Sequence, residues 1–153
     1  MKEKNEVVIY LNELEEAINK YNPNILSDEL TNYILKRCMF FSTKSDIDII
    51  IYGIEDKEQQ GLKDIFHNHF KDLVDKTKKI EQYDDIKRVL LLIVGIVLIC
   101  ISEMFKFVVS ELFLVAGWVV IWELVYNIFF ERIKRNRDYF KYLQLSKANI
   151  KFK

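Results

Sequence analysis

The chain has 153 residues, half of them hydrophobic, with 23 basic and 23 acidic side chains. This length allows one modest domain together with a membrane segment. The charges are segregated: residues 1–86 carry 12 basic and 18 acidic side chains (net −6), and residues 131–153 carry 8 and 2 (net +6). Few charges lie between these regions. An acidic start, an apolar middle and a basic end exclude an ordinary soluble domain, whose apolar residues would be spread along the chain.

The first third of the chain predicts a small α/β unit. Residues 7–11 are a short β-rich run, and residues 22–24 predict a turn around the only proline. Ser27 is a suitable N-cap for a helix that continues to about Phe41. Residues 47–52 form the strongest predicted strand. Because about 35 residues separate the two strands, which is enough for a helical crossover, we expect a right-handed parallel pairing.

Long helices are predicted on both sides of the apolar middle. From Glu55 an apolar stripe recurs at three- and four-residue steps, and nothing breaks the helix before the apolar segment begins. Residues 131–145 also predict a helix, which could pack antiparallel to the first. The alternation of apolar and polar residues over 148–153 then predicts an edge strand on the same sheet.

The apolar middle contains two segments, residues 88–107 and 112–130. The stretch 89–102 carries no charge, and 112–130 carries one, Glu123. About 20 apolar residues cross the ~30 Å hydrocarbon core of a bilayer. We therefore expect a transmembrane hairpin of two helices, since a chain of this size cannot wrap two helices that are apolar on every face.

The flanking charges predict the orientation of this hairpin. Several lysines and arginines, Arg88 among them, precede the uncharged stretch 89–102, and another group follows the second segment. The intervening turn has one basic residue, Lys106. By the positive-inside rule, both ends of the chain are expected in the cytoplasm. Cys38 and Cys100 are then expected to be free thiols.

The predicted fold class is an α+β membrane protein with a two-helix transmembrane hairpin, a small cytoplasmic α/β domain and long stalk helices. The expected regions are, in chain order, a cytoplasmic α/β head (1–60), an amphipathic stalk helix (61–87), a transmembrane hairpin (88–130) and a basic cytoplasmic helix with a possible final strand that joins the head (131–153).

Few residues suggest catalysis. Asp46 and Asp48 lie on one face of a predicted strand, which resembles the Asp-x-Asp strand of nucleotidyltransferases, where carboxylates bind magnesium and nucleotide phosphates. The Gly-Ser pair of that family is missing upstream, so solvated aspartates at the start of a strand are the favoured interpretation. His67 and His69 fall on different helix faces and do not form a chelating pair. Cys38 has no nearby base. We expect no metal, no cofactor and no nucleic acid.

The polar and aromatic residues of the second apolar segment are more informative. Glu123 and Asn127 share a helix face, Trp118 and Trp122 lie one turn apart, and Gly117 permits close approach of another helix. A hairpin offers these side chains few internal partners, which favours self-association into an oligomer. The alternatives are that Glu123 pairs within its own hairpin or lies at the membrane interface.

One resemblance adds to this interpretation. The run 65–70 (IFHNHF), a charged helix, an apolar segment, residues 117–122 (GWVVIW) and a basic helix before a short strand resemble a group of small two-span bacterial membrane proteins without an established activity. Where that group has a proline and an acidic–aromatic cluster after the Gly-Trp motif, this chain has residues 123–130. The resemblance implies a multi-pass protein of the bacterial cytoplasmic membrane with both termini inside.

Two main functions follow as hypotheses. The first is a non-enzymatic membrane scaffold, adaptor or regulatory subunit that contacts a cytoplasmic protein through its head and self-associates. The second is an oligomeric pore or membrane-perturbing effector, as in some bacterial defence systems, supported by Glu123 and Asn127. A membrane-tethered nucleotide-using enzyme would depend on Asp46 and Asp48 alone.

Overall fold

The computed structural model describes residues 5–42 and 45–153 and has a mixed α+β fold with one long helix. The chain divides into two compact units. Unit 1 comprises Met1–Lys76 and Asp138–Lys153, and unit 2 comprises Thr77–Arg137. Unit 1 thus contains both the first and the last part of the chain, as expected if the final strand joins the sheet of the head.

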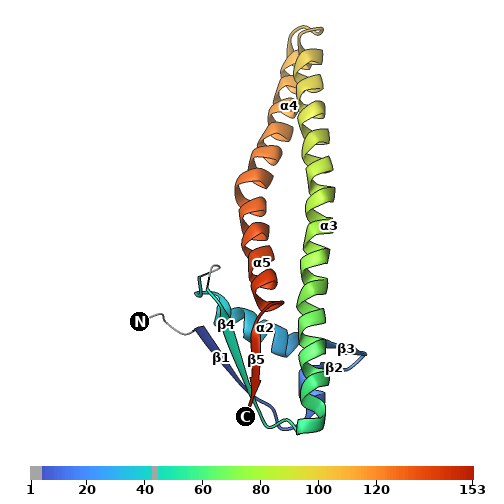
Figure 1. Cartoon of the computed structure of the whole chain (residues 1–153). Helices are drawn as coiled ribbons and strands as arrows, with labels where there is room; N and C mark the ends of the chain where they lie inside the picture. The colour runs from blue at the N-terminus through green and yellow to red at the C-terminus, as the bar shows by residue number, and fades with distance from the viewer. Residues whose placement is uncertain (1–4, 43–44) are drawn as a thin grey trace. The chain divides into compact units, whose positions relative to one another are not determined.

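Unit 1 contains a three-stranded parallel sheet in the order β1-β4-β5, formed by β1 (Asn5–Tyr10), β4 (Ile47–Tyr52) and β5 (Asn149–Phe152) (Figure 1). The two predicted strands and their parallel pairing are confirmed, and so is the final edge strand. Helices separate the three strands in sequence, because parallel neighbouring strands need crossover connections.

A small hairpin follows β1. After α1 (Leu14–Ala17), β2 (Ile18–Asn19) pairs antiparallel with β3 (Asn22–Leu26). The turn predicted at residues 22–24 is wrong by a few residues, because the chain reverses between Asn19 and Asn22. The side-chain oxygen of Asn19 accepts hydrogen bonds from the backbone N–H groups of Tyr21 (2.9 Å) and Asn22 (3.2 Å), which stabilises the reversal.

Helix α2 (Asp28–Cys38) begins where the sequence predicts. The hydroxyl of Ser27 accepts a hydrogen bond from the backbone N–H of Leu30 at 3.3 Å, so Ser27 is the N-cap. The helix ends three residues before the predicted Phe41. Its buried residues include Leu30, Ile34 and Cys38, which recur at helical spacing.

The core of unit 1 lies on one face of the sheet. Strand residues such as Ile49 and Ile51 pack in one cluster with Ile34 of α2 and with Phe66 and Phe70 of the long helix. Moving from β1 to β4 to β5 shifts the chain in the same direction each time, and the general preference for right-handed crossovers agrees with α2 and the unit 1 part of α3 packing on the same face. In Figure 1, α2 lies behind the strands.

The opposite sheet face has a different composition. It carries Tyr10 stacked on Tyr52 (centroids 5.0 Å apart), with Val8 beside Ile50 in the next row. Ile50 is buried but lies outside the core cluster. Parallel sheets are usually covered on both faces, so this exposed face, which we call the open sheet face, is unusual.

Unit 2 consists of helix. The long helix α3 (Asp56–Ser102) contributes its residues from Thr77 onward, and is followed by α4 (Val108–Tyr126), the π-helical segment η1 (Asn127–Glu131) and the start of α5 (Arg132–Leu145). The predicted long helix from Glu55 and the predicted helix over 131–145 are confirmed. The π-helical turns between α4 and α5 were not predicted.

The prediction of two membrane spans is corrected by the helix boundaries. One helical stretch of the described chain, Val108–Leu145, is long and apolar enough to cross a membrane. The first predicted span, 88–107, is not a continuous helix: α3 ends at Ser102, and Phe107 has a φ of 58° in the turn that follows. The uncharged part of α3 is therefore 14 residues long, or ~21 Å, short of the hydrocarbon thickness.

The last turns of α3 pack antiparallel against α4 within unit 2. A Cβ atom on Gly95 would lie 2.7 Å from Ile121, and one on Gly117 would lie 3.1 Å from the carbonyl oxygen of Gly95. The hydroxyl of Ser110 donates to the carbonyl of Ser102 at 2.8 Å near the turn. Gly117 thus permits close helix approach, as its sequence context suggests, and the neighbouring helix belongs to the same chain.

Candidate functional sites

The outer surface of unit 2 is strongly apolar. Trp118 and Trp122 are both more than half exposed. In the most apolar part of the Val108–Leu145 helix, 6% of the residues are buried. Exposed large apolar side chains occur on both helices. On the last turns of α3 they are Val89, Leu90, Leu92, Ile93, Val94, Ile96 and Val97, and on α4 they include Val108, Val109, Leu112, Leu114, Val115 and Val119. We call this surface the apolar belt.

A charged pair lies at one end of the apolar belt. The carboxylate of Glu123 lies 3.9 Å from the ammonium group of Lys87, and both side chains are about half exposed. Glu123 therefore has a partner on the neighbouring helix of its own chain. This is the alternative in which Glu123 pairs within the hairpin, and it removes Glu123 from the argument for self-association.

A buried polar network follows immediately. The guanidinium of Arg88, which is 7% exposed, donates to the side-chain oxygen of Asn127 at 2.9 Å and forms ion pairs with Glu81 and Asp85. Asn127 is 1% exposed and also donates to Glu131 at 2.5 Å. Asn127 is satisfied within the chain and, like Glu123, needs no partner from a second copy.

The π-helical segment positions this network. The backbone N–H of Arg132 donates to the carbonyl of Asn127, five residues back. One extra residue in a helical turn changes the directions of the side chains that follow, and such segments are frequent at functional sites. In this protein the segment begins at Asn127, the residue that binds Arg88.

A second arginine, Arg135 of α5, extends the network. Its guanidinium contacts Glu81 at 3.1 Å and Asp84 at 2.6 Å. Burial raises the pKa of Glu81, but the hydrogen bonds from Arg135 and Arg88 outweigh burial, so this pKa lies below its usual value. Glu81 therefore stays ionised at neutral pH.

The other end of the apolar belt is a short turn with three exposed charged residues, Glu103, Lys106 and Glu111. The rings of Phe105 and Phe113 stack there with centroids 5.3 Å apart. At the Glu123 end, Tyr126 and Phe130 stack in the same way at 5.0 Å. Charged side chains and a stacked aromatic pair thus bound the belt at each end.

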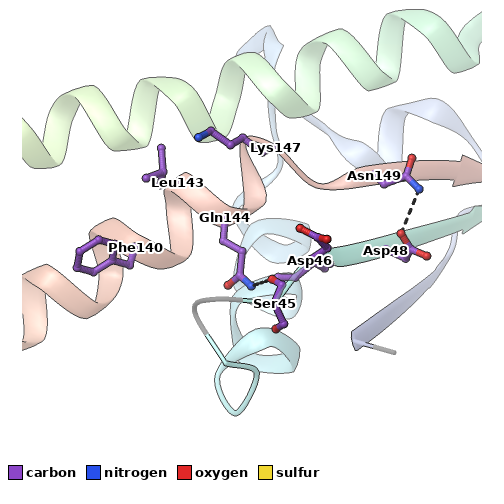
Figure 2. A pocket seen from close by; sticks show the side chains of 9 residues that line it. Ser45, Asp46, Asp48, Phe140, Leu143, Gln144, Lys147 and Asn149 are labelled. Carbon is purple, nitrogen blue, oxygen red and sulfur yellow. Dashed lines mark hydrogen bonds between the residues drawn. The ribbon is translucent and has the colours of Figure 1, made fainter. Parts of the chain in front are cut away.

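Unit 1 has a pocket of about 390 Å³ beside the start of β4, and it contains both aspartates considered in the sequence. Figure 2 shows Asp46 on the side of Gln144, and Asp48 farther along β4 beside Asn149 of the adjacent strand. Gln144 donates to the carbonyl of Ser45, and its side-chain oxygen is buried without a hydrogen-bond partner among the described residues.

Asp48 is engaged by its own sheet. One carboxylate oxygen accepts a hydrogen bond from the side-chain amide of Asn149 at 3.1 Å. The other forms an ion pair with the ammonium group of Lys151 at 2.7 Å. Magnesium ligation would require breaking the Lys151 contact, and a third carboxylate does not join the pair among the residues that the structure describes. The pocket therefore fits a structural contact between β4 and β5 better than a nucleotide-metal site.

The remaining titratable candidates have structural partners. His67 donates to the carbonyl of Ser146 at 2.9 Å, and His69, 8% exposed, lies 3.1 Å from the hydroxyl of Thr31. The two rings contact different elements, as their spacing predicts. Burial raises the pKa of the Cys38 thiol to about 11, partly opposed by Lys141, so Cys38 is a thiol and not a nucleophilic thiolate at neutral pH.

The comparisons with known proteins add no assignment. Searches against protein-family models, curated proteins and solved structures gave no significant match.

Proposed function

We propose that this chain is a non-enzymatic, membrane-anchored adaptor or regulatory subunit. Unit 2 enters the bilayer, and unit 1 binds a cytoplasmic protein. The observation that carries the proposal is the apolar belt: large aliphatic and aromatic side chains of two adjacent helices face outward. Soluble monomers rarely expose contiguous apolar patches above a few hundred Å², and hydrocarbon is the solvent that such a surface favours.

Strand pairing supports entry of the helices as a pair. β4 precedes the apolar belt in sequence and β5 follows it, yet the two strands pair in one sheet. This pairing supports a topology in which both flanks of the belt lie on the same side of the membrane, as two crossings would give. We therefore propose that the uncharged end of α3 accompanies α4 into the bilayer.

Basic flanks support a cytoplasmic location for unit 1. Lys87 precedes the belt and Lys134 follows it, each within a group of basic residues, whereas the turn between the helices has Lys106 alone. The positive-inside rule places such flanks in the cytoplasm. With the resemblance to two-span bacterial proteins, we propose the cytoplasmic membrane of a bacterium.

The open sheet face is the proposed binding surface of unit 1. It combines the exposed ring of Tyr10 with Val8 and a neighbouring ion pair between Asp48 and Lys151. Aromatic residues are enriched at protein interfaces, and parallel sheets are usually covered on both faces. The alternative, an oligomeric pore, is less favoured, because Glu123 and Asn127 have partners within the chain.

Membrane extraction and cysteine labelling test the anchor. We expect the full chain to remain in the membrane pellet after alkaline carbonate treatment. In a variant with Cys38 and Cys100 replaced by serine, a membrane-impermeant maleimide should react with Lys147→Cys only after the cells are permeabilised. Recovery of the chain in the aqueous fraction without detergent would contradict the proposal, and labelling of intact cells would reverse the orientation.

Photo-crosslinking tests the adaptor role separately. A benzophenone amino acid at Tyr10 should give a discrete adduct whose formation is lost in Tyr52→Ser, since Tyr52 supports the Tyr10 ring. The same probe at exposed Lys57 of α3 is the matched control. Equal adducts from both positions would indicate random collision and reject the open sheet face as a binding surface.

A further inference from the structure

The apolar belt is shorter than an ordinary bilayer is thick. On α3 it extends over the 14 residues between Arg88 and Glu103, which is ~21 Å of helix. On α4 it extends over the 11 residues between Glu111 and Glu123, which is ~17 Å. A typical hydrocarbon core is ~30 Å thick.

Both helices place their limiting charges at matching levels. At one end Lys87 and Glu123 form an ion pair across the two helices. At the other end Ser110 donates to Ser102, which keeps the beginning of α4 level with the end of α3, next to Glu103 and Glu111. Neither helix therefore extends the belt beyond the other, because both are bounded by charges at the same levels.

The stacked aromatic rings agree with these two boundaries. Tyrosine and tryptophan side chains concentrate where hydrocarbon meets headgroups, and Tyr126 is such a residue at the Glu123 end. The Tyr126–Phe130 stack lies just beyond Glu123, and the Phe105–Phe113 stack lies at the turn. Each stack thus lies at an interface if the hydrocarbon covers the belt alone.

We propose that unit 2 is matched to a thin bilayer, with the Lys87–Glu123 ion pair defining the inner boundary of its hydrophobic surface. This inference rests on the proposed membrane anchorage and specifies the lipid environment that the anchor selects. In an ordinary bilayer the half-exposed Lys87–Glu123 pair would enter hydrocarbon, or the lipid would thin around the helices. Both cost free energy that rises with the mismatch.

Reconstitution in lipids of graded length tests the inference. The full chain is added to vesicles of monounsaturated phosphatidylcholines whose acyl chains range from roughly 14 to 22 carbons. Insertion is measured as the carbonate-resistant fraction after flotation, together with quenching of Trp118 and Trp122 by brominated lipid. We expect the inserted fraction to be highest in the shortest lipid and to fall by about five-fold or more in the longest, because mismatch costs accumulate per ångström.

Two variants assign the effect to the ion pair. In Lys87→Leu/Glu123→Leu the uncharged stretch that begins in α4 and ends in η1 becomes the 19 residues 112–130, or ~28 Å, so the optimum should move to longer lipids. The matched control is the charge exchange Lys87→Glu/Glu123→Lys, which keeps an ion pair at the same level and should keep the wild-type optimum.

Each outcome has a distinct meaning. A wild-type profile that is flat, or highest in the longest lipids, overturns the thin-bilayer match. An unchanged optimum in the double leucine variant overturns the role of the ion pair. Failure of the wild-type chain to insert into every lipid would instead contradict the membrane anchorage itself. Should the leucine variant fail to show a helical circular dichroism spectrum, the wild-type profile still decides the thickness preference.

Discussion

Units 1 and 2 use their apolar residues in opposite ways. Among the described residues, Leu124 is the one buried apolar side chain in unit 2. The other buried apolar side chains all belong to unit 1. Most exposed large apolar side chains belong to unit 2. Unit 1 therefore removes its apolar surface from water by folding, whereas unit 2 pairs its helices through small and polar residues and leaves most of its apolar side chains exposed.

This difference shows which interactions specify each unit. In unit 1 the cluster around Phe66 and Ile49 supplies the stabilisation, as in any soluble domain. In unit 2 the helix contact consists of Gly95 against Gly117 and the Arg88–Asn127 network. Small residues that allow close backbone approach, with hydrogen bonds between helices, are typical of helix packing in lipid, where burial of apolar surface gives little driving force.

The largest expected effect comes from truncating the core of unit 1. Phe66 is 1% exposed and contacts Phe70 with ring centroids 4.8 Å apart. Phe66→Ala should lower the free energy of unfolding of unit 1 by about 3–5 kcal/mol, measured by pulse proteolysis of the full chain in detergent. The matched control is Phe129→Ala, whose ring is exposed in unit 2. Similar losses for both variants would contradict the contrast between the units.

A smaller loss is expected from the polar network of unit 2. Arg88→Ala leaves Asn127 buried without its donor and removes a partner of Glu81. We expect destabilisation of the helix pair by about 2 kcal/mol, below the value for a fully buried pair because Glu81 and Asp85 still contact water. Hydrogen exchange of the α4 amides should be faster in this variant and unchanged in Lys134→Ala, an exposed control on α5. Unchanged exchange in Arg88→Ala would show that the network does not hold the helices together.

Alanine substitutions at two glycines distinguish the effect of close helix packing from the effect of helix propensity. A methyl group on Gly117 would lie 2.7 Å from a side-chain carbon of Ile99 and 3.1 Å from the backbone oxygen of Gly95, so Gly117→Ala should cost about 1–2 kcal/mol. A methyl group on Gly61 would have no atom within 4 Å, so Gly61→Ala should stabilise α3 by ~1 kcal/mol. Thermal unfolding in detergent, followed by circular dichroism, measures both. Stabilisation by both substitutions would mean that the Gly95–Gly117 approach is looser than described.

Local signals made much of unit 1 predictable. A β-rich run identified 47–52 as a strand, alternation identified 148–153, and Ser27 marked the start of α2, because each pattern depends on residues adjacent in sequence. The turn near Pro23 was misplaced, since the reversal is stabilised by the side chain of Asn19 and not by the proline. Hydropathy also overestimated the first apolar segment, because an apolar turn and an apolar helix have the same hydropathy.

In unit 2 the features that were not predicted depend on contacts between residues that are distant in sequence. Arg88 entered the sequence argument as one of several positive flanking charges, yet it is the buried centre of a network with Asn127 and Glu81. Its partners depend on the register that Gly95 and Gly117 set between the two helices. The π-helical segment has no recognised sequence signal, and the Lys87–Glu123 pair follows from the same register.

The smallest expected effect is a difference in pH response between the two units. Burial, reinforced by Lys76, lowers the pKa of His69 in unit 1, while Asp72 and Asp28 oppose the shift. The folded state therefore binds a proton less readily than the unfolded chain, whose histidine pKa is ~6.5. Stability from neutral His69 is fully present above that value and is lost as pH falls below it. In unit 2 the lowered pKa of Glu81 gives stability that is present above the ordinary value of 4.5 and is lost only as pH falls further.

Between pH 7.5 and 5.5, unit 1 should therefore lose stability while the α4 amides keep their protection. Pulse proteolysis of unit 1 and hydrogen exchange of α4 at the two pH values measure the two responses on the same chain. His69→Gln retains a hydrogen-bonding group for Thr31 but cannot titrate, so this variant should show a smaller loss in unit 1 than the wild type. An equal loss in the variant would assign the pH response to other groups, and a parallel loss in α4 would show that the two units do not unfold separately.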